Sequence, residues 1–226
     1  LLLNLKLANL RSIKEANLDL HSNINVLVGK NGTGKTTVLE SISLLSLGRS
    51  FITPKHRSLI QFGSNEATVH ASVEDSKRLV HSIGISFNIK GTRKIRFDLR
   101  SVNSQATVSR YIPSLVLTPS VADIITGSPV TRRRLMDWGA FYVEKAPAAL
   151  FMAFRRVLAQ RNAILRNRVN YSSMRPWDEQ FVRISKKIDE YRRAYVKKFL
   201  PRFISYQRHF GIPFELDLIY HRGWSK

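Results

Sequence analysis

The stretch that decides the fold lies near the start of the chain and reads Gly29-Lys30-Asn31-Gly32-Thr33-Gly34-Lys35-Thr36. It matches the P-loop pattern G-x-x-x-x-G-K-[ST], in which backbone N–H groups surround phosphate oxygens. Glycine lets the main chain approach a phosphate without a Cβ in the way. The pattern therefore predicts a nucleotide-binding loop.

The sequence on either side of this loop supports the same interpretation. The run from Ile24 to Val28 is apolar and predicts a strand that leads into the loop. Gly48 predicts the end of the helix that follows the loop. Four apolar residues in between share one helical face: Val38, Leu39, Ile42 and Leu45. The strand and helix context argues against the alternative of an ordinary glycine-rich turn, because it places a helix N-terminus against the phosphates.

Each part of the loop has an expected role in holding a nucleoside triphosphate. The Lys35 ammonium should reach the outer phosphates. The Thr36 hydroxyl should be a ligand of Mg²⁺, which keeps most of its waters. The residues expected to surround the triphosphate are Gly29, Lys30, Asn31, Gly32, Thr33, Gly34, Lys35, Thr36 and Thr37.

Composition points to an acidic partner. The chain has 226 residues, a net charge of +21 and a pI near 10.9, which suits nucleic acid better than an anionic membrane. It has no cysteine, which excludes disulfides, thiolate chemistry and Cys-ligated zinc and fits a reducing interior. The six histidines show no metal-ligand spacing. No apolar run reaches the roughly 18 residues of a membrane span.

The first half of the chain reads mainly as strands. Leu3, Leu5 and Leu7 alternate with polar residues, and residues 16–20 form a second short candidate. Residues 66–73, 79–89 and 94–99 alternate in the same way and are joined by short turns. This order predicts an antiparallel sheet beside the P-loop sheet. After Pro113, residues 115–117 predict one more buried strand.

The second half reads as helices from about residue 131 to residue 200. Apolar residues recur at helical spacing over residues 147–168 and 177–199, with a break at Arg175-Pro176 and an end at Pro201. These segments predict an antiparallel helix pair with an aromatic packing seam. Residues 214–220 alternate and predict a strand that returns to the first lobe. The expected division is a P-loop ATP-binding lobe over 1–112, a basic helical lobe over 113–203 and the returning strand over 204–226.

The helical segment holds over half of the positive surplus. Residues 131–203 contain 18 Lys and Arg against 6 Asp and Glu, so 18 − 6 = +12. A charged helix face is usually only a solvated surface, but here the balancing acids are scarce. The sequence therefore predicts binding to the DNA backbone, with each neutralised phosphate adding about 0.9 to the log–log salt slope. No motif for sequence-specific reading is present.

Two parts of a complete ATPase are missing from the sequence. No apolar run ends in Asp-Asp or Asp-Glu, the Walker B pattern that holds Mg²⁺ and activates water. No L-S-x-G-Q signature stands at a predicted helix start. We therefore expect nucleotide binding, and we do not expect efficient hydrolysis from this chain alone.

With these features in place, the chain resembles the RecF family of bacterial recombinational-repair proteins nearly from end to end. The blocks that carry the resemblance, besides the P-loop, are Asn9-Leu10-Arg11, Gly48-Arg49-Ser50-Phe51, Leu117-Thr118-Pro119, Gly127-Ser128-Pro129 with the following Arg triplet, Asp137-Trp138-Gly139, Gln160-Arg161-Asn162, Arg175-Pro176-Trp177-Asp178 and Arg222-Gly223-Trp224. The P-loop is generic to many NTPases, whereas the later blocks are much more specific.

The resemblance implies a fold, a ligand and partners. RecF proteins are α/β, SMC-like, ABC-type P-loop ATPases with a helical second lobe and weak ATPase activity. They dimerise around ATP and Mg²⁺, bind double-stranded DNA near single-strand gaps, and act in the cytoplasm with RecR and RecO to load RecA. Arg11 matches an arginine near the nucleotide, the alternative being a strand-edge charge. The family's signature motif and Walker B strand lie farther along, so we expect a C-terminal portion to be missing here.

Two competing functions remain open at this point. One is a nucleotide-independent DNA-binding fragment with a dormant P-loop, which a comparison of DNA affinity with and without ATP separates from the leading hypothesis. The other is a small-molecule kinase, which the excess of positive charge and the lack of an acceptor-substrate constellation disfavour.

Overall fold

The computed structural model describes residues 1–167, 174–214 and 216–223, and its chain divides into two compact units. Unit 1 runs over Leu1–Thr118 and unit 2 over Pro119–Lys226. The elements of unit 1 are β1 (Leu2–Leu10), β2 (Ile13–Asp19), α1 (Lys35–Leu47), η1 (His56–Leu59), β3 (Glu66–Glu74), β4 (Val80–Asn88), β5 (Arg93–Phe97), β6 (Arg100–Val102) and α2 (Gln105–Ser109).

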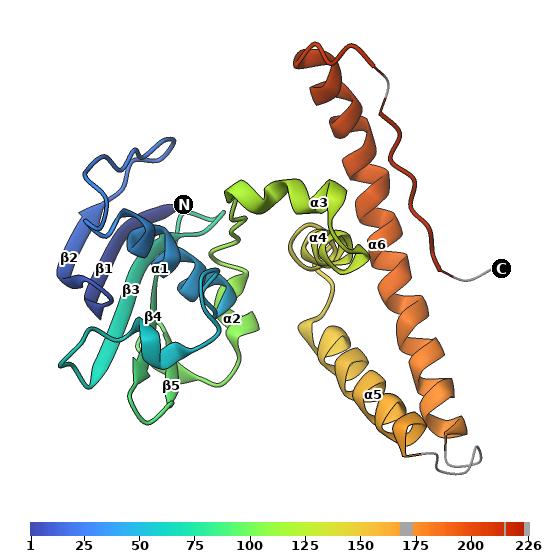
Figure 1. Ribbon diagram of the computed structural model, residues 1–226, viewed down its shortest axis with the longest axis horizontal. Helices are drawn as coiled ribbons and strands as arrows, with labels where there is room; N and C mark the ends of the chain where they lie inside the picture. Colours follow the sequence, from blue (N-terminus) through green and yellow to red (C-terminus); the bar gives the residue numbers. More distant parts are fainter. Residues whose placement is uncertain (168–173, 215, 224–226) are drawn as a thin grey trace. The chain divides into compact units, whose positions relative to one another are not determined.

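The strands of unit 1 form one six-stranded sheet in the order β2-β1-β3-β4-β5-β6 (Figure 1). Every neighbouring pair is antiparallel. The antiparallel sheet that alternation predicted is therefore confirmed, and the structure adds the short strand β6. The separate P-loop sheet expected beside it does not occur among the described residues, because β1 and β2 pair into the same sheet. The β4–β5 connection is a short turn, as the sequence predicted, and Gly91 has a positive φ of 80° in it.

One face of the sheet is packed and the other is open. Alternating residues such as Leu5, Leu7, Val69 and Ile85 are buried with α1, η1 and α2 in one core. The opposite face carries mainly polar and small side chains that are half-buried or exposed, which we call the open face. Antiparallel sheets commonly keep one face in water in this way.

Helix α1 begins at Lys35 and ends where Gly48 takes a φ of 67° and donates its N–H to the Leu44 carbonyl. The glycine cap was predicted and is confirmed. The predicted apolar face is only partly right, since Val38 and Leu45 are buried but Leu39 is 53% exposed. The buried face instead includes several polar residues: Thr37, Glu40, Ser41, Ser43 and Ser46.

Two strands predicted for this unit are absent from the structure. Residues 24–28 are irregular, with Ile24 78% and Val28 89% exposed, so the predicted strand before the P-loop is wrong for this structure. Residues 115–117 are also irregular, with Leu117 72% exposed. A strand forms only when its N–H and C=O groups find a neighbouring strand, and no described strand borders either segment.

Unit 2 is helical in the described residues. Its elements are η2 (Pro119–Ala122), α3 (Asp123–Thr126), α4 (Pro129–Tyr142), α5 (Ala148–Arg166) and α6 (Arg175–His209). Helices α5 and α6 lie side by side and run in opposite directions, as predicted (Figure 1). Their seam is apolar and aromatic, with the rings of Phe154 and Phe181 stacked 5.5 Å apart and Val157, Ile184 and Ile188 buried beside them.

The end of α6 differs from the sequence prediction. Pro201 lies inside the helix, which continues to His209, so the predicted end at Pro201 is wrong. Proline removes one N–H donor and bends a helix, but neighbouring turns can continue it. The predicted strand over residues 214–220 is also wrong for its described part, because these residues are irregular.

The segment after α6 is held along that helix by side-chain contacts. Gln207 donates from Nε2 to the Phe214 carbonyl at 2.6 Å. Farther along, Tyr220 and Arg222 donate to the two carboxylate oxygens of Asp189, at 3.0 and 2.9 Å. Asp189 is buried in α6, so this carboxylate fixes the segment against its own unit.

Candidate functional site

The P-loop forms an exposed turn that leads directly into α1. Gly32 and Gly34 have φ values of 83° and 94°, a conformation that favours glycine. Gly34 is also close to the start of β2, because an added Cβ would lie 2.9 Å from Cγ1 of Ile13. Any other residue at position 34 would strain the backbone and crowd Ile13.

The Lys35 ammonium lies over this loop. Its Nζ donates to the carbonyls of Gly29 and Lys30, both at 2.7 Å. The Thr33 hydroxyl also donates to the Lys30 carbonyl, at 2.9 Å. The lysine is therefore positioned at the mouth of the loop, beside the place where phosphate oxygens would lie.

The donor set of the loop fits a triphosphate and Mg²⁺. Helix α1 has no side-chain N-cap among the described residues, so the N–H groups of its first turn are available to an anion. Thr36 is exposed and can present its hydroxyl to a cation. Thr37 is 5% exposed, which limits its contribution to the backbone N–H. The predicted residues 29–37 thus lie together as one continuous cradle.

Arg11, the remaining predicted residue, is engaged in a polar cluster on α1. It lies in the β1–β2 turn, and its guanidinium forms a two-point ion pair with Glu40, whose side chain is 0% exposed. The hydrogen bond to Glu40 raises the pKa of Arg11 above its ordinary value, because it favours the charged guanidinium. Burial of the guanidinium opposes this shift but is the smaller effect. Arg11 is thus no simple strand-edge charge, since it anchors the turn that contacts Gly34.

Sequence reasoning missed the other two members of this cluster, Glu40 and Ser50. The Ser50 hydroxyl donates to Glu40, and the same oxygen accepts from the N–H groups of Ile52 and Thr53, at 2.8 and 3.0 Å. A signal was present, because Glu40 is the one acid of α1 and Ser50 lies in a block that carries the resemblance. The cluster ties the loop after α1 to the helix that carries the P-loop.

In unit 2, α6 carries a row of basic residues opposite its buried face. We call these residues the α6 cation stripe: Arg183, Lys186, Lys187, Arg193 and Lys197. They are exposed and have no hydrogen-bond or ion-pair partner among the described residues. The 14 residue steps from Arg183 to Lys197 correspond to about 21 Å of helix.

Five of the six acids between residues 131 and 203 are paired elsewhere and do not neutralise the stripe. The ion pairs are Arg192–Asp137 at 2.6 Å, Lys198–Glu144 at 3.0 Å, Arg161–Asp178 at 2.6 Å, Arg175–Glu179 at 3.2 Å and Arg222–Asp189 at 2.9 Å. Glu190 is the remaining acid between residues 131 and 203. Glu190 lies on the same face of α6, three or four residues from Lys186, Lys187 and Arg193, so the five cations keep a net charge of 5 − 1 = +4.

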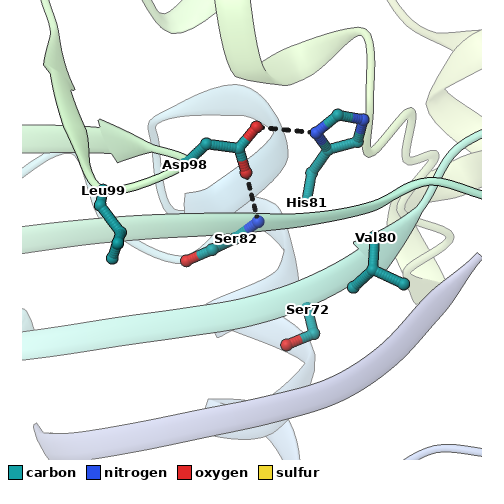
Figure 2. A pocket seen from close by; sticks show the side chains of 6 residues that line it. All are labelled: Ser72, Val80, His81, Ser82, Asp98 and Leu99. Atoms are coloured by element: carbon teal, nitrogen blue, oxygen red, sulfur yellow. Dashed lines mark hydrogen bonds and ion pairs between the residues drawn. The ribbon is translucent and has the colours of Figure 1, made fainter.

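A second polar cluster lies in unit 1 where β4 begins and β5 ends (Figure 2). A shallow pocket of about 310 Å³ is lined there by Ser72, Val80, His81, Ser82, Asp98 and Leu99. The His81 ring is 2.8 Å from the Asp98 carboxylate and 3.5 Å from Asp75, and the Asp98 hydrogen bond chiefly raises its pKa. No group of metal-ligating side chains suited to a cation occurs among the described residues. This cluster joins strand ends and is not the nucleotide site.

Comparison with known proteins places these features in a family. A family model described as an AAA domain matches residues 4–200. The DNA replication and repair protein RecF of Photorhabdus laumondii is 33% identical over 226 residues, which are 100% of this chain and 62% of that protein. RecF of Pseudomonas fluorescens is 37% identical over 207 residues, 90% of this chain and 56% of that protein. The chain thus spans less than two thirds of these relatives.

Solved structures agree on the fold. A structure of the recombination mediator protein RecF with ATP in the RecFOR pathway aligns with a TM-score of 0.78 at 23% identity, covering 87% of this chain and 54% of that one. An SMC ATPase structure aligns with a TM-score of 0.51 at 20% identity, covering 61% and 98%. The predicted α/β P-loop fold of ABC or SMC type and the resemblance to RecF proteins are both confirmed. Within the described residues, no helix has the length and apolar character needed to cross a bilayer.

Proposed function

This chain belongs to the AAA domain family, and on that premise we propose that it is an ATP-binding, DNA-binding protein of RecF-type replication and repair. The observation that carries the proposal is the position of the Lys35 ammonium over the P-loop, next to the uncapped N–H groups at the start of α1. A triphosphate offers more negative charge than the two carbonyls that now accept from Lys35, so the ammonium would transfer to phosphate oxygen.

We propose that the loop holds ATP through its backbone. The N–H groups of residues 30–36 and the dipole of α1 would bind the phosphates, with Lys35 on the outer ones. Thr36 would give its hydroxyl to Mg²⁺, and the ion would supply charge neutralisation between the phosphates. Arg11 would act beside the nucleotide while Glu40 fixes its guanidinium plane.

We propose that unit 2 binds the DNA backbone through the α6 cation stripe. About 21 Å of helix faces roughly six phosphates of one strand at 3.4 Å per phosphate along the axis. Such contacts fix position on DNA and carry no direct base information. The expected ligand is therefore duplex DNA of any sequence, including the duplex beside a single-strand gap.

The ATP site is tested by calorimetry with Mg²⁺ and ATP on Lys35→Ala and on the matched control Lys77→Ala. Lys77 is an exposed lysine in the β3–β4 turn. Loss of a charged contact to phosphate should weaken ATP binding by ~1.5–3 kcal/mol, or tenfold and more, in Lys35→Ala only. Equal ATP affinity in the two variants would count against the assigned site.

The DNA surface is tested by the salt dependence of duplex binding. Lys186→Ala/Lys187→Ala removes two stripe charges, and Lys55→Ala/Arg57→Ala removes two exposed charges of unit 1 as a control. The first variant should lower the salt slope by up to about 1.8, at about 0.9 per phosphate. Repeating both titrations with ATP separates an ATP-controlled binder from a DNA-binding fragment with a dormant P-loop.

For the whole protein we propose the partners that its relatives suggest. ATP would lie between this P-loop and the signature motif of a second subunit in a homodimer, with RecR, RecO and, indirectly, RecA as further partners. Support comes from the RecF relatives and from the RecFOR context of the aligned structure. Light scattering of the full-length protein with and without ATP tests the dimer, and a mass that ATP leaves unchanged contradicts it.

A further inference from the structure

The open face of the unit 1 sheet has a glycine at a position where no contact with the described residues requires one. Gly84 lies in the middle of β4, and its φ is not positive. An added Cβ would meet its nearest neighbours, Cβ of Arg96 and Cδ2 of His70, at 3.9 Å, which is ordinary van der Waals contact. Glycine in a strand interior costs about 0.5–1 kcal/mol relative to alanine and often marks the close approach of another molecule.

Cations border this glycine on the same face. Strand pairing sets Arg96 opposite Gly84, Gly84 opposite His70, and His70 opposite Lys6, so these residues form one row across four strands. Three strand spacings of about 4.8 Å separate Arg96 from Lys6 by roughly 14 Å. Lys94 lies two residues before Arg96 and faces Ser86. We call Lys6, Gly84, Lys94 and Arg96 the open-face row.

The charges of this row are uncompensated. Lys6, Lys94 and Arg96 are exposed and have no hydrogen-bond or ion-pair partner among the described residues. Asp98, which directly follows β5, is hydrogen-bonded to His81 and to the N–H of Ser82. The remaining acids of this face lie at strand ends or on the far edge strand: Glu15, Asp19, Glu66 and Glu74.

The floor between these cations is polar, and its side chains are small apart from His70, whose Nε2 lies 2.8 Å from the Ser82 hydroxyl. Ser72, Ser82, Ser86 and Thr68 surround Gly84 on the neighbouring positions of β3 and β4. Short hydroxyl side chains offer little apolar area to a protein partner but donate readily to phosphate oxygens. Positive charge on edge strands also discourages sheet pairing, yet Lys6 lies on β1, inside the sheet.

We infer that the open-face row is a second contact surface for the DNA backbone, with a phosphate approaching at Gly84 between the flanking cations. The inference rests on the proposed DNA-binding function and extends it from unit 2 to unit 1. In this inference Gly84 leaves room for the DNA strand, and Lys94, Arg96 and Lys6 neutralise the phosphates of that DNA strand.

The first test removes charge. Duplex affinity is measured over a range of salt concentrations for Lys94→Ala/Arg96→Ala, with Lys55→Ala/Arg57→Ala as the control of equal charge. The first variant should lose up to about 1.8 from the salt slope, whereas the control should keep the slope of the unmodified chain. Equal slopes in the two variants overturn the inference.

The second test fills the space and leaves the charge unchanged. Gly84→Val adds a β-branched side chain to a strand, where such residues are favoured, so the melting temperature should hold or rise. Duplex affinity should nevertheless fall severalfold, with Gly84→Ala in between. Undiminished duplex affinity in a folded Gly84→Val variant also overturns the inference.

The outcomes separate this inference from the proposed function. If Lys186→Ala/Lys187→Ala lowers the slope and neither open-face variant changes binding, the function stands and the inference fails. If the unmodified chain binds no duplex DNA, both fail. If an acidic peptide binds this surface and duplex DNA does not displace it, the surface belongs to a protein partner and the inference is overturned.

Discussion

At Arg11 and Glu40 the chain places a full ion pair at the edge of its core. The carboxylate is completely buried, and the guanidinium is 26% exposed. Burying two charges is expensive, and the pair is tolerated because Ser50 supplies a further hydrogen bond. Removing one member of the pair should therefore destabilise unit 1 more than replacing both members with apolar residues.

Arg11→Ala should destabilise unit 1 by about 3 kcal/mol or more, because it leaves the Glu40 carboxylate buried without its partner. Urea unfolding followed by circular dichroism measures the loss. Replacing both residues, as Arg11→Met with Glu40→Leu, should recover most of the stability. If the single and double variants prove equally unstable, the ion pair is not the source of the effect.

His81 makes the stability of unit 1 depend on pH. Hydrogen bonds to Asp98 and Asp75 raise its pKa above the ordinary value near 6.5. A raised pKa in the folded state gives stability that is fully present below about pH 6.5 and is lost as pH rises through the folded pKa. The free energies of unfolding of the unmodified chain and of His81→Gln should thus converge as the pH rises above the folded-state pKa of His81. A gap that widens with rising pH contradicts this assignment.

Between elements, the contact of α4 with α6 depends on a missing side chain. Gly139 is buried in α4, and a Cβ there would overlap with ring atoms Cε1 and Cζ of Tyr195 on α6. Gly→Ala inside a helix usually stabilises it by about 1 kcal/mol. Here the close approach of two helices reverses that expectation.

Gly139→Ala should destabilise unit 2 by about 1–3 kcal/mol, because overpacking forces the two helices apart. Chemical denaturation of the full chain measures the change. Adding Tyr195→Leu should return part of the loss by removing the ring that the methyl group meets. A stabilised Gly139→Ala variant would show that α4 and α6 do not approach this closely.

The elements also show what the sequence could predict. Alternation located β1, β3, β4 and β5 correctly, because one face of each strand is buried against α1 and α2. The same reasoning failed for residues 24–28 and 115–117, since alternation records a tendency to be buried and does not supply a neighbouring strand. Pro201 misled in another way, because a long helix with tertiary contacts continues past one missing donor.

The candidate site was also predictable where it depends on local sequence and was missed where it depends on long-range contacts. The P-loop was predictable because its glycines, lysine and threonine act through a local turn. Glu40 and Ser50 were missed because their role arises from contact with Arg11, which lies 29 residues before Glu40. The α6 cation stripe was predictable as composition, but only the structure shows which cations lack partners.

For the whole molecule, the division into two units predicts two unfolding transitions in calorimetry. Arg11→Ala should lower the transition of unit 1 and leave that of unit 2 in place, while Gly139→Ala should do the reverse. Each unit has its own buried core, so the two destabilisations should not spread. A single transition that both variants shift would show that the units unfold together.

The sheet order carries a consequence for how the molecule matures. Strands β3 to β6 pair with their neighbours along the chain, so this meander closes small loops and can form early. The P-loop and α1 lie in the long connection between β2 and β3. The two ends of this connection come together only when β1, which is paired with β2, also pairs with β3. We therefore expect the P-loop to reach its nucleotide-binding conformation only after β1 has paired with β3, so that ATP would bind only chains in which the sheet of unit 1 is complete.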